Sequence, residues 1–256
     1  MTIDGFHEHD KDAFESFSPD AAERFYDALD WVGRKLHVEV VGLENVPKGR
    51  AILVANHAFA WDIAFAMGAI WRATGRPVWA LGEHAWWYFP FLRRFAASVG
   101  TVDGTQKNCE RLLAADELVL VLPGGLREAV KPRQLRYRLL WGDRFGFVRA
   151  AIKAQAPLVP VAAIGGDEVW DFVGDAYARG RRWLKRDIPI PLPARILPIP
   201  HRVHLKYVIG RPIVPKPLPA DADDPQSLRD VRLLVEGSLH ELIDVELARR
   251  LAHAKN

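Results

Sequence analysis

The chain has 256 residues, of which 49% are hydrophobic and 26% are charged. This is ordinary globular usage, so the composition argues against a disordered protein and allows one sizeable α/β core. The formal net charge of +3 suits an anionic membrane surface or a phosphorylated thioester, and it is too small to indicate nucleic acid as a partner. The single cysteine, Cys109, excludes an internal disulfide and predicts a buried thiol in a reducing compartment.

The N-terminal segment, residues 1–36, is expected to be helical. It opens on an acidic stretch without the pattern of a signal peptide, which favours a cytoplasmic protein. The pair His7 and His9 could bind a metal ion, but a polar terminus is the simpler interpretation and no metal site is expected. Residues 19–36 place apolar side chains on one helical face near basic residues, as a helix at a membrane surface does: Phe25, Leu29, Val32 and Leu36.

A buried strand is predicted at residues 51–55, after an alternating strand at 37–43, because the run is continuously apolar and follows a turn signal. It is followed by His57 and Asp62, five positions apart. A strand that ends in titratable groups is how an α/β protein presents chemistry at the edge of its sheet. His57 is a candidate general base whose tautomer Asp62 would fix, although a surface histidine near a helix-capping aspartate has the same pattern.

The next segments are a helix to about residue 74, a strand at 77–82 and an aromatic cluster at 84–95 that contains Arg93 and Arg94. Aromatic residues beside arginines are typical of an interfacial membrane anchor, and a core or an acyl tunnel would use the same residues. The longest apolar window contains polar and titratable residues, so no transmembrane span is predicted. A lipid substrate would therefore require peripheral association with the membrane.

A second strand end repeats the pattern of the first. The predicted strand at 117–122, with an apolar run at 118–122, leads into a glycine-containing segment with charged residues at its end: Pro123, Gly124, Gly125, Leu126, Arg127 and Glu128. Paired glycines let a ligand approach the main chain closely, and an arginine offers a fork of donors for phosphate or carboxylate. An ordinary strand-to-helix turn with a solvated Arg–Glu pair would have the same pattern. Two such strand ends in one domain favour a shared site.

The alternation of helices and strands predicts one α/β domain with a mixed central sheet flanked by helices. The remaining elements are helices at 86–96, 105–115, 143–155 and 226–253, and strands at 99–102, 157–163 and 202–209. The proline-rich residues 188–200 are expected to be extended or looped. The expected organisation is the N-terminal segment 1–36, a catalytic domain at 37–215, and a linker with a capping helix at 216–256.

The His-x-x-x-x-Asp pattern of His57 and Asp62, followed by Pro-Gly-Gly-x-Arg-Glu, resembles the glycerolipid and lysophospholipid acyltransferases. In many members the third block reads Phe-Pro-Glu-Gly-Thr-Arg, whereas here Gly124 stands at the Glu position and Arg127 is kept. This departure is similar to the branch that contains the type 2 diacylglycerol acyltransferases and the phytyl ester synthases. The resemblance covers about residues 40–215 and implies the fold of a glycerol-phosphate acyltransferase.

The resemblance implies an O-acyltransferase that moves a fatty acyl group from acyl-CoA or acyl carrier protein to a lipid hydroxyl, without a cofactor. His57 would be the general base and Asp62 would orient it, while the backbone of Gly124 and Gly125 would stabilise the oxyanion. Arg127 would hold a phosphate, and the adjacent Glu128 would pair with Arg127 or position the acceptor. The glycine at position 124 favours a neutral acceptor such as diacylglycerol or a long-chain alcohol, and a lysophospholipid stays open.

Two other functions fit the same residues. Water in place of the acceptor would make the protein an acyl thioesterase or lipid hydrolase that uses His57 and Asp62. The Gly-x-Ser-x-Gly elbow of serine lipases is absent, which argues against that particular mechanism. A non-catalytic lipid-binding module at a membrane would keep the same fold without turnover.

Overall fold

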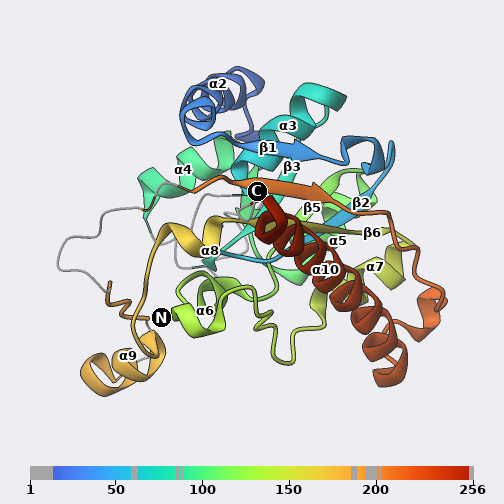
Figure 1. Ribbon diagram of the computed structural model, residues 1–256. Helices are drawn as coiled ribbons and strands as arrows, with labels where there is room; N and C mark the ends of the chain where they lie inside the picture. The colour runs from blue at the N-terminus through green and yellow to red at the C-terminus, as the bar shows by residue number, and fades with distance from the viewer. Residues whose placement is uncertain are drawn as a thin grey trace.

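The computed structural model describes residues 14–58, 63–84, 87, 89–185, 189–193, 201 and 203–253. They form a layered α/β structure in which one central sheet lies between two groups of helices (Figure 1). The sheet has seven strands in the order β1-β7-β6-β2-β5-β3-β4. Neighbouring strands are parallel except for β6 and β7, which are antiparallel. The prediction of an α/β domain with a mixed central sheet and flanking helices is therefore confirmed.

The strands lie close to where the apolar runs predict them. They are β1 (Glu39–Val41), β2 (Ala51–Ala55), β3 (Val78–Gly82), β4 (Thr101–Asp103), β5 (Leu118–Val121), β6 (Leu158–Ile164) and β7 (Lys206–Ile209). The described residues also form the α-helices α2 (Pro19–Leu36), α3 (Ala64–Thr74), α4 (Pro90–Ser98), α5 (Gln106–Ala114), α6 (Gly125–Ala129), α7 (Gly146–Ala154), α8 (Gly166–Val169), α9 (Ala176–Leu184) and α10 (Pro225–His253).

The central strand β2 divides its side chains between two hydrophobic cores, because successive residues of a strand point to opposite faces of the sheet. Ile52 and Val54 pack into the core that α5, α7 and α10 cover. Ala51, Leu53 and Ala55 pack into the core under α2 and α3. A strand that is buried on both faces has to be continuously apolar, and this is the pattern of residues 51–55.

Helix α2 packs directly against α3. Tyr26 of α2 is buried against Gly68 of α3, where a side chain would meet the tyrosine ring at 3.0 Å. Arg72 of α3 forms ion pairs with three acidic side chains of α2, namely Glu23, Asp27 and Asp30. One side of this amphipathic helix is therefore occupied by the domain itself.

The apolar face of α2, which the sequence predicts to lie at a membrane surface, is only partly exposed. Phe25 and Leu29 are half-buried, and the Phe25 ring meets Phe95 of α4 edge-on at 5.7 Å. Val32 is exposed, and the side chain of Leu36 lies outside the described residues. In the described parts of the chain, each helix is too short or too polar to cross a bilayer.

Three helices, α6, α8 and α9, are not predicted from the sequence because they are short or weakly periodic. Helix α9 nevertheless has a clear start signal, since the Asp175 side chain accepts the N–H groups of Tyr177 and Ala178. Helix α4 begins at Pro90, not at residue 86, because proline favours the first helical turn and Phe89 before it is extended. In the predicted extended segment 188–200, the described Pro193 forms an isolated bridge with Phe172, while residues 188 and 194–200 lie outside the described residues.

Candidate active site

The ends of two neighbouring strands bring the two predicted motifs together. β2 and β5 are parallel partners in the middle of the sheet, with Val54 opposite Val121. His57 and Gly124 each follow three residues later, so both lie just beyond the same carboxyl edge of the sheet. His57 is 6% exposed, which is incompatible with the alternative of a surface histidine.

Asn56 fixes the point at which the chain leaves the sheet. Its side chain donates to the carbonyl of Ala163 at 2.9 Å and accepts the N–H of the same residue at 2.8 Å. Asn56 is fully buried, and it continues the pairing of β2 with β6 by one residue through its side chain. The residue before His57 is therefore anchored to the neighbouring strand.

Glu128, which follows the neighbouring strand β5, holds the main chain of His57. Its carboxylate accepts the N–H of His57 at 2.9 Å and the N–H of Leu140 at 3.2 Å, and the residue has no exposed surface. Burial raises the pKa of Glu128 above its ordinary range, and Lys131 and the two N–H groups oppose that rise. A buried carboxylate needs such donors, because an unpaired charge in the interior is costly.

Gly124 is a glycine because Glu128 occupies the space of a side chain. A Cβ atom on Gly124 would lie 1.8 Å from Oε2 of Glu128, although the backbone of Gly124 has an ordinary right-handed conformation. The reason is therefore steric and not conformational. Gly125 is different, since its φ of +53° is a conformation that glycine adopts most readily.

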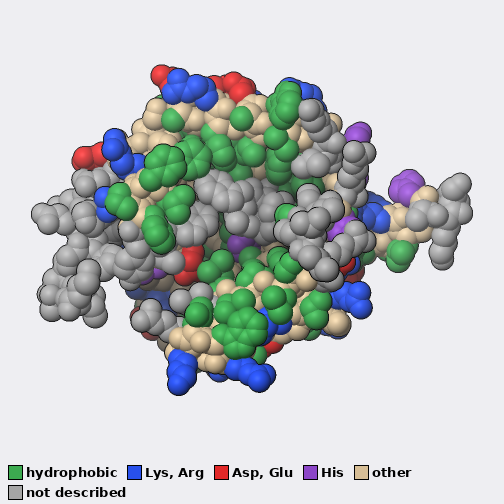
Figure 2. Space-filling view, turned by 90° about the vertical axis from the view of Figure 1, so that its left-hand side faces the viewer, with side chains coloured by type: hydrophobic (Ala, Val, Ile, Leu, Met, Phe, Trp, Pro, Cys, Tyr) green, Lys and Arg blue, Asp and Glu red, His purple; other side chains and the backbone are tan. Residues whose placement is uncertain are grey.

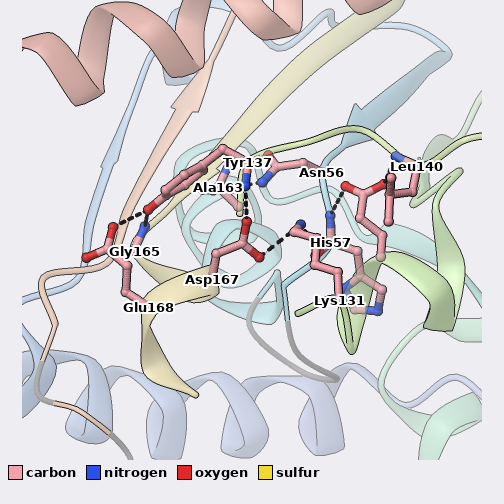
Figure 3. Close-up of polar contacts among 10 residues, drawn as sticks. Asn56, His57, Lys131, Tyr137, Leu140, Ala163, Gly165, Asp167 and Glu168 are labelled. Carbon is pink, nitrogen blue, oxygen red and sulfur yellow. Dashed lines mark hydrogen bonds and ion pairs between the residues drawn. The ribbon is translucent and has the colours of Figure 1, made fainter. Parts of the chain in front are cut away.

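A buried ion pair holds the other side of the His57 peptide. Lys131 donates to the carbonyl of His57 at 3.2 Å and pairs with Asp167 at 2.9 Å, and both charged side chains are almost completely buried. Asp167 also accepts the N–H of Tyr137. Figure 3 shows Asp167, the ion-pair partner of Lys131, on one side of His57 and Leu140, whose N–H shares the Glu128 carboxylate with His57, on the other. The sequence patterns do not identify Asn56, Lys131 and Asp167 as site residues, because their partners are distant in the chain.

His57 lies at the wall of a cavity of about 550 Å³. The cavity is lined largely by apolar side chains that come from both sides of the sheet edge, among them Ile63, Met67, Leu81, Val121, Leu126 and Phe147. Cys109 also lines it, and burial raises the pKa of its thiol to about 12, so the thiol stays protonated at neutral pH. The size and lining suit an apolar ligand.

The other predicted site residues have different places. Asp62 lies outside the described residues, so its role as the partner of His57 stays a prediction. Gly125 lines the cavity, but its N–H donates to the carbonyl of Leu122 at 2.9 Å and is not available to an oxyanion. Gly124 is not among the described residues that line the cavity, so the oxyanion role of its N–H stays a prediction.

Arg127 is exposed and lines a second cavity of about 580 Å³ instead of the His57 cavity. The pKa of the neighbouring Asp175 is lowered mainly by the helix N–H groups that it caps, and the charge of Arg127 adds to this effect. The carboxylate of Glu128 is turned toward main-chain N–H groups and does not pair with Arg127 in the described structure. The predicted contact of Arg127 with a phosphate stays a prediction for the second cavity.

An imidazole–carboxylate pair lies at the ends of β3 and β4. His84 Nδ1 is 2.8 Å from Oδ2 of the buried Asp103. The His84 side chain is 49% exposed and is not part of the lining of the His57 cavity. Among the described residues, no cluster of three His, Cys, Asp or Glu side chains has the arrangement of a metal site.

Fold and site together define an α/β protein that presents a buried histidine to an apolar cavity at the carboxyl edge of its sheet. A family model described as Acyltransferase matches residues 37–164, half of the chain. The chain belongs to this acyltransferase family, which confirms the family that the two sequence motifs predict. Its closer placement in the branch with type 2 diacylglycerol acyltransferases stays a prediction.

Two relatives illustrate the family. An uncharacterized protein of Mycobacterium tuberculosis is 32% identical over 231 residues, which cover 86% of this chain and 63% of that protein. A protein of Mus musculus named "DGAT1/2-independent enzyme synthesizing storage lipids" is 27% identical over 187 residues, covering 73% of this chain and 54% of its own length. The chain thus spans between about half and two thirds of these relatives.

One solved structure is also similar. The 1-acyl-sn-glycerophosphate (LPA) acyltransferase PlsC from Thermotoga maritima is 22% identical, with a TM-score of 0.49, and the match covers 80% of this chain and 72% of that one.

Replacing Gly124 by alanine tests the steric coupling to Glu128. We expect Gly124→Ala to displace the carboxylate, to lower the free energy of unfolding by about 1–3 kcal/mol, as overpacking does, and to move the His57 main chain. The matched control is Gly237→Ala in α10, where nothing lies within 4 Å and the helix should gain up to about 1 kcal/mol. Urea unfolding of both variants measures the difference, and equal stability of the two would contradict the coupling.

Proposed function

We propose that this protein is an O-acyltransferase that transfers a fatty acyl group from a thioester to a lipid hydroxyl. The observation that carries the proposal is a buried histidine, rigidly held at its main chain, on the wall of an apolar cavity in a member of the acyltransferase family. The cavity would hold the acyl chain, and His57 would meet the thioester at its wall. Acyl-CoA or acyl carrier protein would be the donor.

In the proposed reaction the imidazole of His57 removes the proton of the acceptor hydroxyl while the oxygen attacks the thioester carbonyl carbon. The N–H of Gly124 supports the negative charge on the carbonyl oxygen. The carbon–sulfur bond then breaks, and the leaving thiolate takes the proton from the imidazolium, which restores neutral His57. Asp62 is proposed to orient the imidazole and to stabilise its charged form.

Direct attack by the acceptor is favoured over an acyl-enzyme. Cys109 is the thiol on the cavity wall, and the raised pKa of about 12 keeps it protonated and weakly nucleophilic. The proposed acceptor is a neutral lipid alcohol, an assignment supported by the Pro-Gly-Gly block and by the storage lipids in the name of the mouse relative. A lysophospholipid is the second acceptor to test.

Replacing His57 and, separately, His84 by alanine tests the assignment of His57 as the general base. With labelled palmitoyl-CoA and diacylglycerol, lysophosphatidate, a long-chain alcohol or no acceptor, we expect His57→Ala to lower ester formation by about 10²–10⁴-fold, the usual contribution of a general base. His84→Ala is the matched control, since the His84 imidazole is paired with the Asp103 carboxylate but does not line the cavity.

Each other outcome names a different function. Equal loss of palmitoyl-CoA with and without acceptor would make the protein a thioesterase. Activity that depends on His84 and not on His57 would overturn the site. No turnover by any form, with retained binding of lipid vesicles, would favour the non-catalytic lipid-binding module.

We further propose that the protein meets the membrane through one side of the molecule, where α4 and α9 lie (Figure 1). Of the aromatic cluster at 84–95, Trp87 is buried whereas Phe89 and Phe91 are 60% and 80% exposed, and residues 85, 86 and 88 lie outside the described residues. Arg93 and Arg94 follow on the same helix. Aromatic side chains beside arginines suit an anionic bilayer surface.

Helix α9 adds a second segment in which exposed apolar side chains lie beside arginines, and the sequence patterns do not predict it. Trp183 and Leu184 are 61% and 51% exposed and directly follow Arg181 and Arg182. Figure 2 views this side of the molecule and shows hydrophobic side chains gathered in its upper and its lower part, with basic side chains beside them. Two anchors on one side would orient the domain on the membrane more firmly than either alone.

Vesicle flotation tests this surface. We expect Phe91→Glu and Trp183→Glu each to weaken binding to vesicles of phosphatidylglycerol and phosphatidylcholine by about tenfold or more, because each removes a large apolar contact and adds a negative charge. The control is Leu234→Glu in α10, which replaces a side chain of similar exposure, 56%, on another part of the molecule. Equal binding by all three variants and the unchanged protein would contradict the proposed surface.

A further inference from the structure

Arg144 is a cation of the His57 cavity that neither motif contains. It lies between β5 and α7, its guanidinium donates through Nη1 to the carbonyl of Pro123 at 2.5 Å, and it lines the cavity together with His57. A Cβ atom on Gly125 would come within 3.0 Å of the same nitrogen. The Pro-Gly-Gly turn therefore makes room for this guanidinium and also holds it.

The Pro123 carbonyl that binds Arg144 lies at the same edge of the sheet as His57. Pro123 follows β5 by two residues and His57 follows β2 by two residues, and these strands are parallel neighbours. Arg144 is thus fixed to the strand end beside the one that carries the proposed base. A guanidinium held at this edge lies where the polar part of an acylated ligand would emerge from an apolar cavity.

The hydrogen-bonding capacity of Arg144 is largely unused. Within the described residues it forms no ion pair with a carboxylate, and one of the five N–H donors of its guanidinium has a protein partner, the Pro123 carbonyl. The other arginine of the cavity, Arg149, is paired with Asp223 at 2.6 Å. The acidic residues Glu83 and Asp143 also line the cavity, so the net charge of its lining does not by itself favour an anion. What favours an anion at Arg144 is the place of this side chain at the sheet edge and the N–H donors of its guanidinium that have no partner among the described residues.

We propose that Arg144 is the centre of a phosphate-binding subsite in the His57 cavity. This proposal rests on the proposed acyl transfer and names the chemistry of its substrate: a phosphate group on one of the two reactants. A fixed, planar guanidinium suits phosphate because it offers parallel N–H donors. The phosphate belongs either to the carrier of the acyl thioester or to the head group of the acceptor. Arg127, in the second cavity, is the rival residue for this contact.

Kinetics with matched substrates separate the two sources. Palmitoyl-CoA is compared with palmitoyl-N-acetylcysteamine, which has no phosphate, at a fixed concentration of monoacylglycerol. Lysophosphatidate is then compared with monoacylglycerol, with the phosphate-free thioester as donor. For Arg144→Gln we expect KM to rise by about 10–100-fold for one phosphate-bearing partner only, with kcat retained, which is the range for hydrogen bonds to a charged group.

Three variants complete the kinetic test. Arg144→Lys should recover part of the affinity, since an ammonium keeps the charge but lacks the fork. Arg138→Gln, an exposed arginine that lines neither cavity, should leave both substrate series unchanged. A KM increase that is equal for substrates with and without phosphate would show that Arg144 only supports the cavity wall, and this would overturn the subsite. Loss of phosphate selectivity in Arg127→Gln instead of Arg144→Gln would overturn it as well.

Binding without turnover distinguishes failure of the subsite from failure of the proposed reaction. Calorimetric titration of the folded protein with a palmitoyl-CoA thioether and with lysophosphatidate should show a Kd that Arg144→Gln raises for one of them. Such binding in a protein without transferase activity would contradict the proposed reaction and support the subsite. Active protein in which Arg144→Gln changes neither Kd nor KM would contradict the subsite alone.

Discussion

The site depends on a main chain that is held between buried charges. The N–H of His57 is bound by the carboxylate of Glu128, and its carbonyl is bound by Lys131, which pairs with Asp167. Such charges are tolerated in an interior only when they satisfy one another, and the removal of one leaves the other uncompensated. The interior therefore fixes the peptide of His57 from both sides, and the proposed base needs little ordering when a ligand enters.

This constraint also explains the glycines of the second motif. Glu128 reaches His57 only because Gly124 has no side chain, and Gly125 leaves room for the Arg144 guanidinium that rests on Pro123. The departure from the common acyltransferase block is thus linked to a glutamate four residues later in the same chain. We therefore interpret Gly124 and Glu128 as one unit that positions the segment of the proposed base.

Sequence patterns predict the parts of this arrangement that are local. The apolar runs identify β2 and β5, and because parallel strands end at a common edge, they also bring His57 and the Pro-Gly-Gly turn together. The patterns do not identify the contacts of Asn56, Lys131 and Arg144, since each joins segments that are far apart in the chain or depends on the exact path of a loop. Likewise, no spacing in the sequence indicates that Arg127 faces a different cavity from His57.

The most direct test of the account is a crystal structure of the protein with a palmitoyl-CoA thioether, an analogue that cannot be cleaved. The account predicts that the acyl chain fills the cavity lined by Met67 and Val121, with the thioether beside the His57 imidazole. An acyl chain in the second cavity, beside Arg127 and away from His57, would contradict the assignment of the active site.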